Sequence, residues 1–297
     1  MRSRPTFVAF PALALVLAGV LAGGCGDSSG SAQAAGVGVV RVVASTSVIA
    51  DWLGEIGGDR LALTTLAAGG ADVHTVQLAP GAVIAIAAAD LVVLNGAGLE
   101  AAFADVVKEN ATGVVLTLAE SIAIEPFSGS TAPDPHFWLD AELAATAVGL
   151  IGGALSEVDP AGAAGYRDNL ARYAAAIAEV DAEVGAALAA LPPERRQLVT
   201  FHDAFGYFAR RYGLRVAGFV SGGPESEPSA QAIAELIQTV EASEADRIFT
   251  EPQFRSSVLE QVAREAGVSI RTLHSQLSEA APSYLALLRL NARALTG

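Results

Sequence analysis

Residues 159–191 read DPAGAAGYRDNLARYAAAIAEVDAEVGAALAAL and carry apolar side chains at helical spacing. The apolar positions are Tyr166, Leu170, Tyr173, Ile177, Val180, Val184 and Leu188. Asp159 and Pro160 predict the start of a helix, as a cap followed by a proline in the first turn, and prolines 192 and 193 predict its end. One continuous helix of about 30 residues would extend about 45 Å. We therefore expect a stiff connector long enough to join two lobes.

On both sides of this segment, short apolar runs alternate with helical patterns, which is typical of βαβ units and parallel sheets. The predicted fold class is α/β, with two Rossmann-like lobes of mostly parallel sheet, 39–158 and 192–297, joined by one long rigid helix. Predicted strands cover 39–44, 61–66, 91–94, 114–118, 198–201, 216–220, 247–250 and 269–273. Predicted helices cover 47–56, 80–88, 204–212, 229–242, 256–266 and 281–294.

The composition favours a globular protein that does not bind nucleic acid. The chain has 297 residues, 52% of them hydrophobic, which is enough for a substantial core. It carries 18 Lys and Arg against 32 Asp and Glu, a net charge of −14, so it would repel phosphate backbones. Aromatic residues make up only 6%, which gives few stacking platforms for sugars or bases. We expect cationic or neutral ligands.

The first 25 residues are typical of an export signal, with Arg2 and Arg4 before an apolar run over 7–22. A membrane-spanning or buried helix is the alternative, but Pro11 interrupts the run and glycines end it. The segment LAGGC at 21–25 resembles a bacterial lipobox, in which Cys25 is lipidated, although Ala22 stands where leucine is usual. A plain secretory signal is the other reading. Residues 26–38 then predict a flexible tether.

The chain contains only four histidines, and each falls at a predicted strand end or in the loop that follows. They are His74, His136, His202 and His274. In open α/β sheets, ligands bind outside the carboxyl ends of the strands. Four imidazoles converging there would form a nitrogen-rich site suited to zinc. No short ligand motif joins the four histidines, and each taken alone is more often a surface or hydrogen-bonded residue than a metal ligand.

The sequences around the histidines resemble the solute-binding proteins of ABC importers that bind zinc or manganese. The three histidine motifs are GADVH at 70–74, DPHFWLD at 134–140 and FHDAFGYF at 201–208. Supporting matches are IGGD at 56–59, ADLVVLNG at 89–96, TEPQF at 250–254, YL at 284–285 and RLN at 289–291. The resemblance runs from about residue 39 to the end of the chain.

The resemblance implies a monomeric receptor, not an enzyme, that holds one divalent metal ion between two lobes and passes it to an ABC permease. His74 and His136 would come from the first lobe and His202 from the second. The family commonly has an aspartate of a Leu-Asp-Pro pattern as fourth ligand, where this chain has Leu-His-Ser at 273–275. His274, Glu251 or a water could complete the shell.

The choice of metal follows from the third histidine. His202 resembles the zinc branch of the family, whereas a glutamate there would resemble the manganese branch. Imidazoles suit Zn²⁺ better than Mn²⁺, which prefers oxygen ligands. Nickel, copper and cobalt also accept imidazoles. We therefore expect Zn²⁺ as the transported ligand, with Mn²⁺ second.

Acidic residues near the histidines could offset the charge of the metal. The candidates are Asp72, Asp134, Asp140, Asp203 and Glu251. For the aspartates the alternative is helix capping or ordinary surface charge, while Glu251 ends a predicted strand at the ligand-facing edge. Trp138 and Phe205 are expected to pack rather than to bind metal.

Two other classes of function compete with the receptor. A zinc hydrolase normally keeps one coordination position open for water, whereas four protein ligands would close it. The chain has no HExxH helix, and no GxSxG sequence joins a predicted strand to a predicted helix, as a nucleophile elbow requires. An adhesin or structural lipoprotein stabilised by metal is the third reading, and transport through a permease would separate it from the first.

Overall fold

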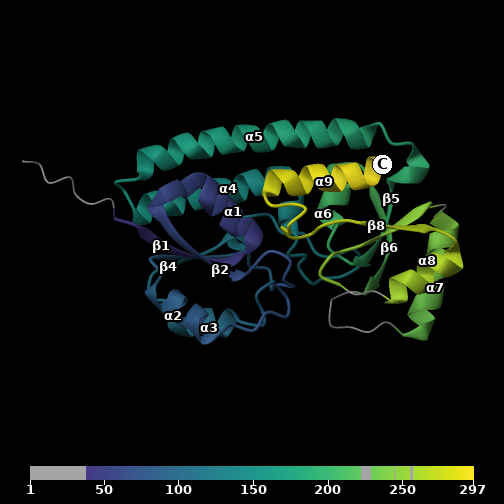
Figure 1. The fold of residues 1–297 in the computed structure, drawn as a ribbon, viewed down its shortest axis with the longest axis horizontal. Helices are drawn as coiled ribbons and strands as arrows, with labels where there is room; N and C mark the ends of the chain where they lie inside the picture. Colours follow the sequence, from purple (N-terminus) through teal and green to yellow (C-terminus); the bar gives the residue numbers. More distant parts are fainter. Residues whose placement is uncertain (1–37, 222–228, 244, 255–256) are drawn as a thin grey trace, which may run out of the picture. The chain divides into compact units, whose positions relative to one another are not determined.

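The computed structural model describes residues 38–221, 229–243, 245–254 and 257–297 (Figure 1). The predicted signal segment, Cys25 and all but the last residue of the predicted tether lie outside these ranges. Each lobe contains a sheet with helices around it. In chain order the strands and helices are β1 Val40–Thr46, α1 Ser47–Gly57, β2 Leu61–Ala67, α2 Pro80–Ala88, β3 Leu91–Leu94, α3 Ala104–Asn110, β4 Val114–Thr117, α4 Ala141–Val158, α5 Ala163–Ala189, β5 Gln197–His202, α6 Gly206–Arg211, β6 Arg215–Ser221, α7 Ala230–Ser243, β7 Arg247–Thr250, α8 Ser257–Ala266, β8 Ser269–Thr272 and α9 Tyr284–Thr296.

The first sheet has the strand order β2-β1-β3-β4, and all of its pairings are parallel. β1 lies inside the sheet, where Val42 is in register with Leu63 on one side and Leu91 on the other. Its β-branched residues are almost all buried, as expected of a strand covered on both faces. Thr46 ends β1 and caps α1 by accepting a hydrogen bond from the backbone N–H of Ile49. The helix begins at Ser47, as predicted.

The second sheet repeats this arrangement with the order β6-β5-β7-β8, again with parallel pairings. β5 is an interior strand, and Thr200 pairs with Phe249 of β7. In both sheets the strands therefore point their carboxyl ends to one edge, where loops lead into the next helix. The prediction of two parallel α/β lobes is confirmed.

Helix α5 spans 27 residues, which corresponds to about 40 Å at 1.5 Å per residue. It packs against α1 and α4, which belong with the first sheet, and against α9, which follows the second (Figure 1).

The helix is shorter at both ends than the predicted span of 159–191. Asp159 lies in the turn between α4 and α5, where its carboxylate accepts hydrogen bonds from Arg60 (2.8 Å) and the Tyr166 hydroxyl (2.6 Å). Asp159 therefore joins two helices instead of opening one.

Helices α3 and α4 were not predicted. α4 is rich in alanine and glycine, so its apolar pattern has little contrast, and by length and composition alone it could cross a membrane. Its buried face, which includes Ala144, Val148, Ile151 and Leu155, belongs to the core shared with α5. α4 is therefore a core helix in this structure.

One cluster of buried side chains runs through both lobes. It includes Trp52 of α1, Tyr173 of α5, Phe208 of α6 and Tyr284 of α9. Smaller clusters lie on the other side of each sheet, against α2 and α3 in one lobe and against α7 and α8 in the other. Because apolar surface is shared along the connector, separating the lobes would expose it to water.

Candidate metal centre

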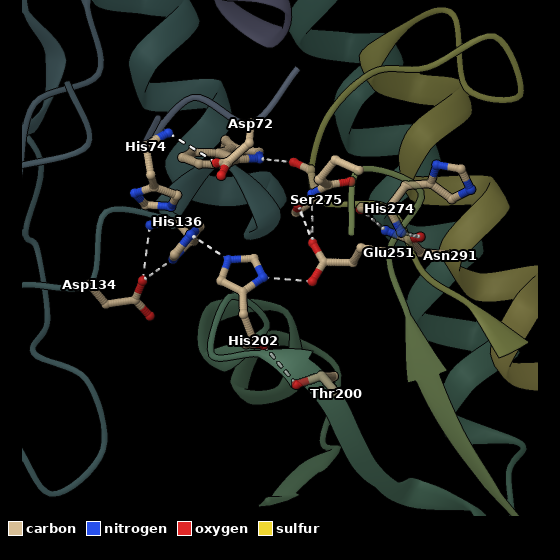
Figure 2. A network of polar contacts seen from close by, with 12 residues as sticks. Asp72, His74, Asp134, His136, Thr200, His202, Glu251, His274, Ser275 and Asn291 are labelled. Atoms are coloured by element: carbon tan, nitrogen blue, oxygen red, sulfur yellow. Dashed lines mark hydrogen bonds and ion pairs between the residues drawn. The ribbon is translucent and has the colours of Figure 1, made fainter. Parts of the chain in front are cut away.

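Three of the predicted histidines meet at the carboxyl edges of the two sheets. His74 lies in the loop after β2, His136 directly before the short 3-10 helix Phe137–Leu139, and His202 at the end of β5. One ring nitrogen from each falls within a group whose atoms all lie within 4.8 Å of one another. His136 is 2% exposed and His202 3%, while His74 is partly buried. Figure 2 shows the three imidazoles facing one another.

Carboxylates fix the orientation of two of these rings. Nδ1 of His136 lies 2.7 Å from Oδ1 of Asp134, and Nδ1 of His202 lies 2.6 Å from Oε1 of Glu251. Because an ionised carboxylate can only accept, each Nδ1 carries a proton and donates it. In its neutral form, each ring then presents an unprotonated Nε2 atom to the shared space. A carboxylate behind each imidazole is the usual arrangement around metal-binding histidines.

The spacing of the facing nitrogens matches a tetrahedral metal ion. Nε2 of His136 lies 3.4 Å from Nε2 of His202. Zinc–nitrogen bonds of about 2.0–2.1 Å at a tetrahedral angle place two nitrogens about 3.3–3.4 Å apart. Two unprotonated nitrogens at this distance repel each other unless a metal ion or a shared proton lies between them. The arrangement can therefore hold a small divalent cation.

The loop of His74 is shaped by Asp72. Its carboxylate accepts a hydrogen bond from the backbone N–H of His74 (3.1 Å) and one from the Thr75 hydroxyl (3.3 Å), which forms a tight Asx turn. Burial, together with the neighbouring His136 and His202, lowers the pKa of His74 to about 3. The ring is therefore neutral at physiological pH, as a metal ligand must be.

Glu251 acts on the charge of His202 and is itself held by other side chains. Burial by itself lowers the pKa of His202, but the Glu251 carboxylate outweighs this and raises it. Glu251 is 1% exposed, and its second oxygen accepts hydrogen bonds from the Ser275 hydroxyl (2.5 Å) and the Gln253 amide (3.0 Å). Both oxygens of Glu251 are therefore occupied by protein donors.

His274 is not part of this group, which corrects the placement expected from the sequence. Its Nδ1 lies 3.1 Å from the Ser278 hydroxyl, and its backbone N–H and C=O are both bonded to the Asn291 side chain at 2.8 Å. Figure 2 shows its ring on the far side of Glu251 from the three imidazoles. The side chain of the next residue, Ser275, points to Glu251 instead and donates a hydrogen bond to it.

The remaining predicted residues have varied roles. Asp140 caps α4 by accepting a hydrogen bond from the backbone N–H of Glu142 (2.9 Å). This is the helix-capping role that the sequence analysis gave as the alternative to offsetting the charge of the metal. Asp203 is 9% exposed, and burial together with nearby Asp134 raises the pKa of its carboxyl group. Phe205 is packed in the shared core, as predicted. Trp138 packs there too, but its indole N–H also donates to the Ser275 carbonyl (2.7 Å).

Sequence reasoning missed Ser275 and the role of Trp138. Ser275 contacts Glu251 through its hydroxyl and Trp138 through its carbonyl. The only signal in the sequence was that Ser275 directly follows His274, a candidate ligand at the end of a predicted strand. Gln253 lay within a recognised motif, TEPQF, but no role was assigned to it.

Comparison with known proteins places the chain in a family. The family model described as "ZnuA: Zinc-uptake complex component A periplasmic" matches residues 42–297. The chain belongs to this family. The zinc-binding protein TroA of Treponema pallidum is 33% identical over 241 residues, covering 80% of this chain and 78% of that protein. The manganese-binding lipoprotein MntA of Halalkalibacterium halodurans is 28% identical over 263 residues, covering 89% and 87%.

Solved structures of the family share the fold. The periplasmic zinc-binding protein TroA of Treponema pallidum aligns with a TM-score of 0.79 and 27% identity, covering 86% of this chain and 97% of that one. A cadmium-bound periplasmic metal-binding protein from Candidatus Liberibacter asiaticus aligns with a TM-score of 0.78 and 28% identity, with the same coverage. The two-lobed α/β architecture is therefore common to this family.

Proposed function

We propose that this protein captures zinc outside the cytoplasm and delivers it to the permease of an ABC importer. His74, His136 and His202 are the ligands. The observation that carries the proposal is the convergence of three imidazoles with Asp134 and Glu251 bonded behind two of them. These rings are already in the tautomer and orientation that metal binding needs. Membership of the family supports a receptor for a divalent metal.

Zinc is favoured over manganese because the three ligand atoms are nitrogens. Manganese prefers carboxylate, carbonyl and water oxygens. The relatives carry names for both metals, and one from Yersinia pestis is called an iron-binding protein, so family membership alone does not choose. Both oxygens of Glu251 already accept hydrogen bonds, which leaves the fourth coordination position to a solvent oxygen.

A three-histidine centre is also the ligand set of some hydrolytic zinc enzymes. The sequence analysis separated a receptor from a zinc hydrolase by four protein ligands, which would leave no position for water. Because His274 lies outside the group, the number of ligands no longer distinguishes these two classes of protein. The family, which consists of uptake components, favours the receptor. Hydrolysis assays on the zinc-loaded protein, with ester and peptide substrates, are expected to give no activity above that of free zinc.

The N-terminal residues suit this role. We propose that residues 1–25 direct export, that Cys25 carries the lipid that anchors the protein at the outer face of the membrane, and that residues 26–38 form the tether. Several relatives are named lipoproteins, which supports an anchor. The receptor would act as a monomer beside its permease. Labelling with a radioactive fatty acid, lost in a Cys25→Ala variant, would test the anchor.

The test of the metal site uses single alanine variants with a matched control. Purified without chelator or histidine tag, the protein is expected to contain one zinc ion per chain. Competition titrations should show that His74→Ala, His136→Ala and His202→Ala weaken zinc binding strongly. His274→Ala should remain close to the wild type, because that ring lies outside the group. Unchanged affinity in the first three variants would overturn the site, and a preference for manganese would overturn the choice of metal.

A further inference from the structure

Trp138 and Ser275 join the two lobes directly beside the candidate metal centre. Trp138 lies two residues after His136, and its ring centroid is 5.3 Å from that of the histidine. Its Nε1 donates a hydrogen bond of 2.7 Å to the carbonyl oxygen of Ser275, which lies 137 residues further along the chain. Both residues are 2% exposed. The hydrogen bond is therefore protected from water and fixes the His136 segment against the second lobe.

The side chain of Ser275 reaches the other carboxylate-supported histidine. Its hydroxyl donates to Oε2 of Glu251, whose Oε1 accepts from Nδ1 of His202. Gln253 donates through Nε2 to the same two partners, Glu251 (3.0 Å) and the Ser275 hydroxyl (2.9 Å). A single residue thus contacts the His136 segment through its carbonyl and the His202 ring through one carboxylate (Figure 2).

The loop that carries His74 contacts the same stretch of chain, just after Ser275. The carbonyl oxygen of Leu277 accepts a hydrogen bond of 2.9 Å from the backbone N–H of Gly70, at the start of the loop that carries His74. At the adjacent Gly69, a Cβ atom would lie 3.2 Å from the Leu277 oxygen, so the two backbones approach closely. Residues 275–277, here called the coupling segment, therefore contact the segments of His136 and His74 directly and reach His202 through Glu251.

Trp138 is also held from a second direction. Its backbone carbonyl accepts a hydrogen bond of 2.8 Å from the hydroxyl of Tyr284, which is fully buried at the start of α9. The residue is therefore bonded on both its ring and its backbone to the part of the chain that follows β8. This double attachment limits how far the His136 segment can move relative to the coupling segment.

We infer that Trp138 and Ser275 are positioning residues that hold the histidines at the spacing a metal needs before the metal arrives. The inference rests on the proposed function and adds residues that touch no metal. A preformed site avoids the cost of ordering its ligands on binding, and differences of this kind appear mainly in the dissociation rate. Breaking the Trp138–Ser275 hydrogen bond should therefore speed metal release.

The chain offers a matched control, because it contains only two tryptophans. Trp52 is fully buried, and its indole nitrogen has no hydrogen-bond partner among the residues that the structure describes. Trp138→Phe and Trp52→Phe are thus the same change at two buried positions, and only the first removes a hydrogen bond between the lobes. Ser275→Ala tests the second contact, since it removes the hydroxyl that holds Glu251 and keeps the carbonyl.

The experiment measures the release of Zn²⁺ to a chromophoric chelator by stopped flow, and the visible absorption of the Co²⁺-loaded proteins. Trp138→Phe should release zinc about five- to tenfold faster than the wild type, as expected for one buried hydrogen bond. Ser275→Ala should also release faster, and Trp52→Phe should remain within about twofold. The cobalt spectrum should change in the first two variants only, because it reports ligand geometry.

The other possible results distinguish a failure of the positioning role from a failure of the proposed function. If Trp138→Phe and Trp52→Phe lower the melting temperature of the metal-free protein but leave release rates and cobalt spectra unchanged, the positioning role is overturned and Trp138 is a core residue only. If Trp138→Phe does not fold, wild-type release by Ser275→Ala overturns the inference instead. A wild-type protein that binds neither Zn²⁺ nor Co²⁺ would overturn the proposed function itself.

Discussion

Oε1 of Glu251 lies 2.6 Å from Nδ1 of His202, and the two side chains are 1% and 4% exposed. Water therefore does not screen this contact, and the carboxylate acts on the imidazole at close to full strength. The same carboxylate is bonded to Ser275 and Gln253, so it cannot turn toward the facing Nε2 atoms without losing hydrogen bonds. Glu251 therefore acts on the metal site by holding and polarising the His202 ring, not as a metal ligand.

The first prediction concerns this pair. Glu251→Gln keeps the shape of the side chain and an acceptor for Nδ1 but removes the negative charge. The imidazole becomes a weaker donor of its Nε2 lone pair, and we expect zinc affinity to fall about tenfold or more in competition titrations. Glu260→Gln, at an exposed position of α8, is the control and should change nothing. Equal affinities in the two variants would show that the charge of Glu251 does not act on the site.

The second prediction concerns Asn291, which is fully buried and holds the backbone of residue 274 through two hydrogen bonds of 2.8 Å. Asn291→Ala leaves a buried N–H and a buried C=O without partners. We expect the free energy of unfolding to fall by about 2–4 kcal/mol in urea titrations. Asn169→Ala, which removes one partly buried hydrogen bond to Ile56, should cost about 1 kcal/mol. A smaller loss at Asn291 than at Asn169 would contradict this reading.

The third prediction concerns stability in acid. Burial favours the protonated form of Asp181, but hydrogen bonds from Arg211 and Tyr212 outweigh it and lower the pKa of this carboxyl group. A carboxyl group whose pKa is lowered by folding stabilises the protein at pH values above its pKa in the unfolded chain, about 3.9. This stabilisation is lost as the pH falls through the pKa of the group in the folded protein. Asp181→Asn should therefore cost about 1–2 kcal/mol near neutral pH, allowing for partial exposure.

The difference between Asp181→Asn and the wild type should shrink as the pH falls below about 4, where the wild-type carboxylate becomes protonated. Urea unfolding at pH 7, 5 and 3 measures it. Asp168→Asn, at an exposed position of the same helix, is the control and should show little difference at any pH. A penalty that is constant across all three pH values would mean that the ionised form of Asp181 is not what stabilises the fold.

The fourth prediction concerns motion of the lobes. The buried cluster that includes Trp52, Tyr173, Phe208 and Tyr284 is continuous across both lobes, and α5 packs along it. Because a large rotation would expose this surface, zinc should order loops and shift the lobes only slightly. Small-angle scattering should therefore give nearly equal radii of gyration with and without zinc, with His202→Ala as the unresponsive control. A marked compaction on zinc addition would be incompatible with the shared core.

Much of the fold was readable from the sequence because its elements are local patterns. The apolar runs over 39–44 and 91–94 predicted two of the strands, and the periodic segment within 159–191 predicted α5. The same logic failed for α4, whose alanines and glycines give no contrast between its faces. It also misplaced the start of α5, because the Asp-Pro signal lies in a turn closed by Arg60 and Tyr166.

By itself the sequence determined that His74, His136 and His202 lie at a strand end or in the loop that follows, since strand position follows from local hydrophobicity. Only the tertiary structure decided which way each side chain faces. His274 and Ser275 are neighbours, yet the His274 ring contacts Ser278 while the Ser275 hydroxyl contacts Glu251. Two hydrogen bonds with Asn291 hold the backbone N–H and C=O of His274 in place. Likewise, the hydrogen bond from Trp138 to Ser275 spans 137 residues of sequence. Such contacts depend on how two lobes pack, and a local pattern carries no information about that.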